Sequence, residues 1–434
     1  MRLLLAWALL GAVATADAAD ISDAARIRAH IDALYPEVER LYIELHQNPE
    51  LSLQEKRTAA TLAHRLRGLG FDVTTGIGGH GIVGLLRNGA GPILMIRTDM
   101  DALPIEELTG LPYASRVRAS DESGTDVPVM HACGHDIHMA AWIGTAAILS
   151  RQRDLWSGTL MLVGQPAEER FLGAKAMLAD ALFTRFPKPD MALAIHADTG
   201  MPAGSVGIAP GYVLANSESV NITIYGRGGH GAYPHRTVDP VVIAARTVLS
   251  LQTIVAREND PMEPAVITVG SIHGGTKHNI IPDEVRLQLT VRSYKSEVHK
   301  RLLAAIERIA KAEANAALAP KDPVVKSVES TRATFNDAAL TARVTNALLA
   351  GFGAENVTRP SPRPAGEDFS EYVAAGVRGA FIWVGAADPV KYAESQAGGP
   401  ALASGHTSFF APDRERTLRN AILAETLAAL ELME

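Results

Sequence analysis

The chain has 434 residues, of which 47% are hydrophobic and 21% are charged. This composition is that of a soluble globular protein, and the length exceeds what one ordinary core organises, so we expect two domains. The net charge of −7 gives no electrostatic reason to expect a nucleic acid as partner.

The first residues have the pattern of a secretory signal peptide. Arg2 supplies a positive charge, residues 3–13 form an apolar stretch too short to span a bilayer, and residues 16–18 form an A-x-A cleavage site. We expect residues 1–18 to be removed by a cut after Ala18 and the mature protein to be periplasmic or secreted. The alternative is a buried N-terminal helix. No later segment has the roughly 18–20 uninterrupted apolar residues of a membrane helix, so we expect no membrane attachment after cleavage.

Four short apolar runs predict the strands of a buried sheet. They alternate with helical patterns such as residues 139–149, which is typical of an α/β fold with a mainly parallel sheet and helices on both faces. Polar side chains follow these runs directly. Because parallel sheets bind ligands beyond the carboxyl ends of their strands, we expect the site there. The runs are residues 92–96, 159–163, 191–195 and 380–384.

The middle of the chain has a different pattern. Residues 219–225 and 286–294 alternate apolar and polar side chains, as half-exposed antiparallel strands do. A helical pattern and a third strand lie between them, and a second helix follows. We expect a smaller α+β, ferredoxin-like domain at residues 214–329, inserted into a discontinuous larger domain of residues 19–213 and 330–434.

The only cysteine, Cys133, lies in the segment that is densest in metal-binding side chains, together with His131, His135 and His138. A lone cysteine in an exported protein has no intramolecular disulfide partner, which favours a metal-bound thiolate. A thiolate with imidazoles suits zinc or another borderline divalent ion. The alternative is a buried neutral cysteine near unrelated surface histidines. His131 and His138 fit surface or supporting positions better than ligand positions.

Carboxylates and a histidine follow three of the apolar runs. Glu168 and Glu169 are adjacent, and such carboxylates repel each other in a dry site unless a cation holds one and leaves the other as a general base. A solvated helix start is the alternative. Asp99 and Asp101 leave their run on the same side, where either can orient a ligand histidine or, alternatively, cap a turn. His196 is a ligand candidate.

A glycine-rich turn at residues 226–235 holds His230 and His235. Its consecutive glycines allow the backbone to bring His230 close to a partner surface. The turn does not match a nucleotide-binding motif, because the chain has neither a P-loop lysine nor a strand–GxGxxG–helix unit. We therefore reject a nucleotide as the ligand.

Taken together, these motifs resemble one family across nearly the whole mature chain, the metallopeptidase-like aminoacylases, carboxypeptidases and amino-acid-conjugate amidohydrolases. The chain is most similar to the subfamily of hippurate and indole-acetyl-amino-acid hydrolases. Seven segments occur in the order of the family, which makes the resemblance strong. They are residues 46–52, 97–105, 130–138, 165–169, 228–235, 279–282 and 366–369.

The resemblance implies a site for two divalent ions, with zinc, manganese, cobalt and nickel all compatible. Cys133 would bridge the ions and Glu168 would be the general base. In the smaller domain, which in this family dimerises and acts as a lid, His230 would polarise the scissile carbonyl. Asn279 and Arg292 would bind the carboxylate end of the substrate, which suits the bidentate geometry of arginine. The implied metal ligands are Cys133, His135, Glu169, His196 and His406.

The sequence departs from the family pattern near two of these residues. Residues 388–404 form a longer, Gly/Ala-rich stretch before His406, whose immediate neighbours are also unusual. Lys277 and His278 precede Asn279 and bear on substrate choice.

The sequence thus predicts an exported, homodimeric amidohydrolase that uses metal-activated water to cleave the amide bond of N-acyl amino acids or small peptides. Two alternatives belong to other classes of protein. The first is a cysteine amidase with Cys133 as nucleophile and His135 or His138 as base. The second is a metal- or peptide-binding protein without catalysis, against which the intact glutamate pair argues.

Overall fold

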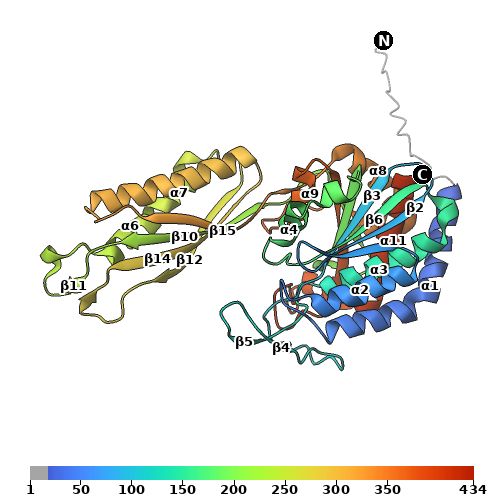
Figure 1. Cartoon of the computed structure of the whole chain (residues 1–434), viewed down its shortest axis with the longest axis horizontal. Helices are drawn as coiled ribbons and strands as arrows, with labels where there is room; N and C mark the ends of the chain where they lie inside the picture. Colours follow the sequence, from blue (N-terminus) through green and yellow to red (C-terminus); the bar gives the residue numbers. More distant parts are fainter. Residues whose placement is uncertain (1–17) are drawn as a thin grey trace, which may run out of the picture.

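The computed structural model describes residues 18–434. Figure 1 shows two bodies, a larger α/β domain and a smaller domain that extends from one side of it. The predicted signal peptide lies outside the described residues, apart from Ala18, where α1 (Ala18–His46) begins. The cut after Ala18 therefore stays a prediction.

The larger domain is built on an eight-stranded sheet in the order β1-β2-β6-β3-β7-β18-β8-β17. Its four central strands are parallel, and the four apolar runs of the sequence form them, as predicted. β1 and β2 add antiparallel strands at one end. The bounds are β1 (Asp72–Ile77), β2 (Gly81–Asn88), β3 (Ile93–Asp99), β6 (Gly158–Gln165), β7 (Met191–Pro202), β8 (Val206–Gly207), β17 (Val357–Thr358) and β18 (Arg378–Ala387).

Helices cover both faces of this sheet, as predicted. On one face α1, α2, α3, α8 and α11 bury a continuous apolar layer that includes Leu41 and Trp142. On the other face α4, α5 and α9 pack around Met177. The predicted helix at residues 139–149 lies inside α3. The bounds are α2 (Lys56–Gly68), α3 (His135–Arg151), α4 (Gly173–Ala179), α5 (Leu182–Arg185), α8 (Ala338–Phe352), α9 (Ser370–Ala374) and α11 (Arg414–Met433).

The smaller domain is a four-stranded antiparallel sheet in the order β12-β14-β10-β15, with α6 and α7 packed on it. This strand order is that of a ferredoxin-like fold, inserted into the larger domain as predicted. The β11–β13 pair forms the tip of the smaller domain far from the larger one (Figure 1). The bounds are β10 (Asn216–Tyr225), β11 (Gly229–His230), α6 (Pro240–Thr253), β12 (Ala265–His273), β13 (Ile280–Ile281), β14 (Glu284–Ser293), α7 (Ser296–Ala316) and β15 (Val324–Thr331).

The two connections between the domains run side by side. β9 immediately precedes β10, β16 closely follows β15, and β9 pairs with β16. This arrangement forms a two-stranded joint. The bounds are β9 (Gly211–Leu214) and β16 (Thr334–Asn336), and the remaining elements are β4 (Arg118–Ser120), β5 (Asp126–Pro128), α10 (Pro389–Gln396) and short helical turns at Arg153–Leu155, Pro234–Arg236, Ile254–Glu258 and Ala354–Asn356.

α6 has one apolar face against the sheet and a second one outside. Together with the turn that follows it, α6 is the one helix within residues 18–434 that is long and apolar enough to cross a membrane by length and composition. Ile243 and Leu251 are buried in the core of the smaller domain. Val241, Val242 and Leu249 are exposed. The helix is therefore a core helix of the smaller domain that leaves an apolar surface uncovered.

Candidate metal centre

Three central strands bring polar side chains to one edge of the sheet. β3 ends at Asp99, which is paired with Gln165 at the end of β6. β7 pairs with β3 in parallel, and the continuation of this register places His196 of β7 opposite Asp99. α3 starts at this edge with His135. The carboxyl ends of the parallel strands therefore form the site, as expected for this fold class.

Cys133 belongs to two groups of potential metal ligands. The first group consists of Cys133, His135 and His196, and Sγ of Cys133 lies 3.4 Å from Nε2 of His196. The second group consists of Cys133, Glu169 and His406. In each group the ligand atoms lie within 4.8 Å of one another. The five residues that the family resemblance implies as ligands thus come together, and Cys133 is common to the two groups.

His406 reaches the site from a loop far along the chain. Its Nε2 lies 3.4 Å from Oε2 of Glu169, although 56% of the His406 side chain is exposed. Its backbone has a φ of 62°, in the left-handed region. The N–H of His406 donates to the carbonyl oxygen of Ala132 at 2.8 Å. This hydrogen bond places His406 beside the residue before Cys133, so its unusual sequence setting does not displace it.

His135 is held through one ring nitrogen only. Nδ1 lies 2.8 Å from the carbonyl oxygen of Asp101 and 3.4 Å from its Oδ1. Nε2 is buried without a hydrogen-bond partner in the described chain and lies 3.8 Å from oxygens of Glu168 and Glu169. Oε1 of Glu169 also lacks a partner there. A cation between these atoms would satisfy both, so the donor set fits a metal ion.

Asp99 is paired most closely with His138, and its Oδ2 also lies 3.8 Å from Nε2 of His135. Nδ1 of His138 donates to Oδ1 of Asp99 at 2.7 Å, and its Nε2 accepts a hydrogen bond from the N–H of Ala197 at 2.8 Å. Both nitrogens are therefore in use. The His138 ring lies 4.7 Å from the ring of His196, measured between centroids, so the Asp99–His138 pair supports His196 from the side. Asp101 is the residue that orients the ligand His135 directly.

His131 and His138 are both buried, so of the two positions predicted for them the surface position is wrong and the supporting position remains. Burial lowers the pKa of His131 to about 4, and the ring is therefore neutral. Neither of its ring nitrogens has a hydrogen-bond partner within residues 18–434. His131 belongs to neither ligand group.

Burial raises the pKa values of the two adjacent glutamates in the site. It is the largest cause for Glu169, whose pKa rises to about 8, and for Glu168, whose pKa rises well above its usual range. Burial and the nearby Glu169 also raise the pKa of the Cys133 thiol. Such a cluster holds protons unless cations replace them. The electrostatics therefore agree with the geometry of a metal centre.

Arg97 forms a buried ionic cluster beside the site. The sequence patterns did not predict this cluster. Its guanidinium donates to Asp99 at 2.8 Å and to Glu367 at 2.8 Å. It also donates to Asp368 at 3.0 Å, and oxygens of Glu367 and Asp368 lie within 4.8 Å of one of Glu168. The signal that could have suggested this cluster is an arginine inside an apolar strand, since a buried arginine requires carboxylates.

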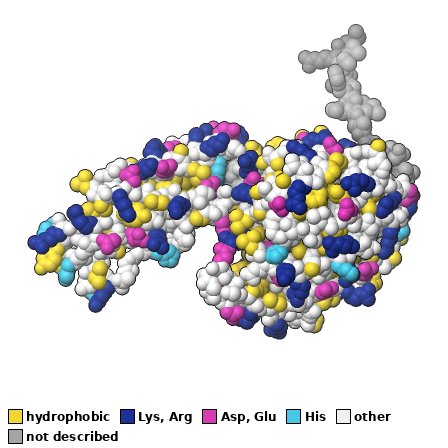
Figure 2. Space-filling view, in the orientation of Figure 1, with side chains coloured by type: hydrophobic (Ala, Val, Ile, Leu, Met, Phe, Trp, Pro, Cys, Tyr) yellow, Lys and Arg dark blue, Asp and Glu magenta, His cyan; other side chains and the backbone are white. Residues whose placement is uncertain are grey.

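His230 and Asn279 lie together at the tip of the smaller domain. His230 belongs to β11, and the N–H of the next residue, Gly231, donates to the carbonyl oxygen of Asn279 at 2.8 Å. In Figure 1, β11 lies at the end of the smaller domain away from the larger one. Figure 2 shows an open notch between the two domains. Within one chain, His230 therefore does not adjoin the metal ligands.

Arg292 lies at the other end of the smaller domain, near the joint. It is paired with Ser217 at the start of β10. Its Nη1 is buried and has no hydrogen-bond partner in the described part of the chain. Arg292 lines a cavity of about 500 Å³ whose walls include Tyr212 and Tyr294. An unpartnered guanidinium nitrogen beside an apolar cavity is suited to bind a carboxylate.

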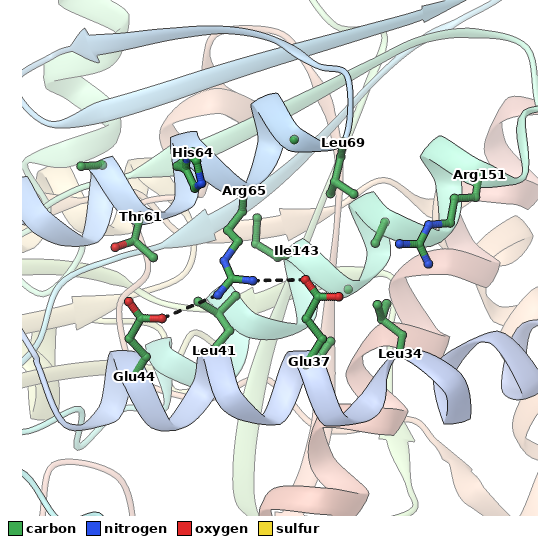
Figure 3. A pocket seen from close by; sticks show the side chains of 15 residues that line it. Leu34, Glu37, Leu41, Glu44, Thr61, His64, Arg65, Leu69, Ile143 and Arg151 are labelled. Carbon is green, nitrogen blue, oxygen red and sulfur yellow. Dashed lines mark hydrogen bonds and ion pairs between the residues drawn. The ribbon is translucent and has the colours of Figure 1, made fainter.

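A larger groove lies away from these residues. α1, α2 and α3 surround about 650 Å³ of space, and Arg65 reaches across it to Glu37 at 3.1 Å and Glu44 at 3.7 Å (Figure 3). None of the residues that line this groove belongs to the ligand groups. The size of a cavity therefore does not locate the chemistry in this protein.

Comparisons with known proteins agree with this geometry. The sequence profile of Peptidase family M20/M25/M40 matches residues 95–397. An N-acetyl-L-cysteine deacetylase of Bacillus subtilis (strain 168) is 35% identical over 353 residues, which cover 79% of this chain and 78% of that protein. A hippurate hydrolase of Campylobacter jejuni subsp. jejuni is 38% identical over 287 residues, which cover 65% of this chain and 71% of that protein.

A solved structure has the same fold. It is the YXEP protein of Bacillus subtilis, a dinuclear metal binding peptidase from the M20 family, with a TM-score of 0.75 and 26% sequence identity. The match covers 93% of this chain and 99% of that one. The profile, the relatives and the fold point to the same family as the motifs of the sequence. The chain therefore belongs to peptidase family M20/M25/M40 and to its metal-dependent amidohydrolases.

Proposed function

We propose that this protein is an exported amidohydrolase that cleaves the amide bond of N-acyl amino acids or small peptides with metal-activated water. One observation carries the proposal. Cys133 is shared by two ligand groups, and Glu168 lies within 3.8 Å of the ligand His135. The names of two similar proteins, an N-acetyl-L-cysteine deacetylase and a hippurate hydrolase, support an N-acyl amino acid as substrate. The signal-peptide pattern of residues 1–18 supports export.

Two divalent ions would be held by the two ligand groups, with Cys133 common to both. When bound, they polarise the amide carbonyl and lower the pKa of a water molecule. The thiolate favours zinc, whereas the histidines and Glu169 also accept manganese, cobalt or nickel.

Glu168 is the general base in this proposal. Glu168 and Glu169 both belong to a group of potential ligands with His135, and in this proposal Glu169 binds the metal and leaves Glu168 free to exchange protons. The Glu168 side chain is only 7% exposed, and burial together with Glu367 raises the pKa of its carboxyl. A carboxylate with a raised pKa accepts a proton from the attacking water more readily, and can then deliver it to the leaving amine.

Arg292 would bind the free carboxylate of the substrate. An N-acyl amino acid has one such carboxylate next to the scissile amide, and Nη1 of Arg292 is a buried donor without a partner within residues 18–434. The adjoining cavity, with Tyr212 and Tyr294 in its walls, offers apolar surface for the amino-acid side chain. In this proposal the smaller domain acts as a lid that closes over the strand ends and brings Arg292 to the substrate.

A second copy of the chain would supply His230. Val241, Val242 and Leu249 on α6 are 46%, 55% and 72% exposed. β12 forms the edge of the neighbouring sheet and pairs on one side only within the described chain. An apolar helix face beside a free sheet edge is typical of a surface that another copy covers. We therefore propose a homodimer in which each tip, with His230 and Asn279, reaches the metal centre of the other subunit.

Two observations oppose the cysteine-amidase alternative. Both ring nitrogens of His138 are engaged, so His138 is not free to act as a base. Burial and Glu169 raise the pKa of the Cys133 thiol, whereas a nucleophilic cysteine requires a lowered pKa.

Hydrolysis of a substrate panel tests the proposal. The protein is loaded in turn with Zn²⁺, Mn²⁺, Co²⁺ or Ni²⁺ and assayed with N-acetyl, N-benzoyl and indole-acetyl amino acids and with dipeptides. We expect turnover with at least one metal and its loss on chelation. Full activity after chelation would overturn the use of metal, and bound metal without hydrolysis of any panel member would overturn the amidohydrolase proposal.

Export has its own test. The full chain is expressed in a bacterium with a periplasm, and the N-terminus of the recovered protein is determined by mass spectrometry. We expect a periplasmic protein that begins at Ala19. Uncleaved protein confined to the cytoplasm would contradict export and would leave the proposed reaction unaffected.

A further inference from the structure

His46, the last residue of α1, is clamped between two carboxylates outside the metal centre. Only 3% of its side chain is exposed. Nδ1 lies 2.6 Å from Oδ2 of Asp136, and Nε2 lies 3.1 Å from Oε1 of Glu107. Burial lowers the pKa of His46, but its hydrogen bonds to Asp136 and Glu107 outweigh burial and raise the pKa to about 9. The ring is therefore an imidazolium that donates a hydrogen bond on each side.

The first carboxylate belongs to the segment that carries two metal ligands. Asp136 directly follows the ligand His135 in the first turn of α3. Its other oxygen accepts a hydrogen bond from the N–H of Ile137 at 2.9 Å, so the carboxylate is fixed from both sides. His46 thus holds the start of α3, and with it the position of His135 and of the preceding Cys133.

The second carboxylate belongs to a loop that contacts the segment of His406. Oε2 of Glu107 accepts a hydrogen bond from the N–H of Ser115 at 2.6 Å, which fixes the loop around His46. The N–H of the next residue, Leu108, donates to the carbonyl oxygen of Ser408 at 2.8 Å. Ser408 lies two residues after His406. A continuous chain of contacts therefore leads from His46 to the loop that supplies the last ligand.

We propose that His46 is a positioning residue of the metal centre, which joins the start of α3 to the His406 loop and so assembles the ligand group of Cys133, Glu169 and His406. This inference rests on the proposed metal-dependent function. His406 depends on the clamp more than the other ligands do, because its side chain is largely exposed and its N–H donates to Ala132, in the segment before α3 that the clamp holds. His135 and His196 lie on regular elements and have their own supports in Asp101 and the Asp99–His138 pair.

Titration of metal-free protein with Co²⁺ tests the inference without any substrate. Two binding events are followed by calorimetry and by the absorption of the cobalt–thiolate bond. In His46→Gln, which removes the positive charge, we expect the ion of the His406 group to bind about 10–100-fold less tightly, as is usual when a supporting contact of a ligand is lost. We take this ion as the weaker of the two, because the His406 side chain is 56% exposed. The tighter ion should keep its affinity. His64→Gln, which replaces an exposed histidine of α2, is the matched control and should leave both affinities unchanged.

A second variant cuts the other end of the clamp and leaves the His46 ring in place. Leu108→Pro lacks the N–H that donates to Ser408, whereas Leu108→Ala keeps it. We expect the same selective loss of the weaker ion in Leu108→Pro and not in Leu108→Ala. If His46→Gln fails to fold, which circular dichroism will show, this pair decides the question. Wild-type affinity for both ions in folded His46→Gln, or in Leu108→Pro, would overturn the positioning role.

The outcome is separable from the proposed reaction. If wild-type protein binds two Co²⁺ ions and the variants do the same, the positioning role of His46 is wrong while the amidohydrolase proposal stands. If the variants lose the weaker ion but the wild type hydrolyses no member of the substrate panel, the positioning role stands and the reaction is wrong.

Discussion

Sγ of Cys133 lies 3.4 Å from Nε2 of His196 and at the same time belongs to the group formed with Glu169 and His406. One residue is therefore shared by two groups of potential ligands that come from different elements of the fold. His196 and His406 each belong to one group only. Substitutions of Cys133 and of the two histidines are therefore expected to change the metal content in different ways.

Cys133→Ser should weaken both ions together, because a serine hydroxyl is a far poorer anionic ligand than a thiolate. His196→Ala should release mainly one ion, because His196 belongs to one group. Metal content per chain, measured by mass spectrometry after dialysis, checks both expectations. Retention of two ions by the Cys133→Ser protein would show that the sulfur does not bridge them.

Glu168→Gln should lower kcat by about 10²–10⁴-fold, since it removes the general base while keeping the shape of the side chain. The metal content should stay at the wild-type value, because the adjacent Glu169 is the proposed ligand. Glu44→Gln, in the groove between the helices of the larger domain, is a control that should change neither quantity. Substantial activity in Glu168→Gln would assign the proton transfer to another group.

Mixing two inactive variants should restore activity if His230 acts across a dimer. His230→Ala subunits keep an intact metal centre, and Glu168→Gln subunits keep an intact tip. When an equal mixture is dissociated and reassociated, statistical pairing makes about half of the dimers mixed. Each mixed dimer contains one complete site of two, so the mixture should have roughly a quarter of wild-type activity. The assay is initial-rate hydrolysis of the best substrate. No recovery in verified mixed dimers would place His230 in its own subunit's site or outside the reaction.

Arg292→Ala should raise KM for substrates that carry a free carboxylate by about 10–100-fold, in line with the loss of a charged hydrogen bond. The corresponding amino-acid amides, which have no carboxylate, should show little change between wild type and variant. Steady-state kinetics with matched acid and amide substrates separates the two cases. An equal loss for both would mean that Arg292 has a structural role in the smaller domain.

Glu425 of α11 makes the stability of the fold dependent on pH. Burial raises the pKa of its carboxyl to about 8, and the hydrogen bond that Thr145 donates at 2.9 Å offsets only part of this effect. The unfolded chain loses this proton near the ordinary pKa of 4.5, whereas the folded protein keeps it. The contribution of Glu425 to stability is therefore fully present below pH 4.5 and is lost as the pH rises through about 8.

Glu425→Gln should remove this dependence and stabilise the protein at pH 8–9 by roughly 1–3 kcal/mol. The free energy of unfolding is measured by urea denaturation of the metal-free protein at several pH values. Its slope against pH shows the contribution of Glu425. Glu415→Gln, on an exposed position of the same helix, should leave the slope as in wild type. An unchanged slope in Glu425→Gln would mean that the carboxyl ionises normally in the folded protein.

Sequence patterns predicted the framework of the site because they depend on local rules. Apolar runs of strand length followed directly by Asp99, Glu168 and His196 locate the carboxyl ends of parallel strands, and parallel strands place these ends at one edge. The spacing around Cys133 likewise showed which segment is rich in ligand atoms.

Pairings between distant segments could not be predicted in the same way. The hydrogen-bond partner of His138 depends on the angle at which α3 crosses β3. The spacing of residues along the chain does not predict that angle. Arg97 finds Glu367 across 270 positions of sequence. The sequence also could not predict the placement of His230. A motif indicates the chemistry of a side chain, but it does not indicate which subunit's site that side chain would enter.

The order of strands has a consequence for how the chain is made. β18 is the last strand in sequence but lies inside the sheet, between β7 and β8. The smaller domain is one continuous segment and can fold as soon as it is synthesised, while the sheet of the larger domain still has an open gap. His406 arrives later still. A chain that stops before β18 would therefore expose the apolar edges of β7 and β8 and lack the last ligand, so truncated products should aggregate and be degraded instead of accumulating as partly active enzyme.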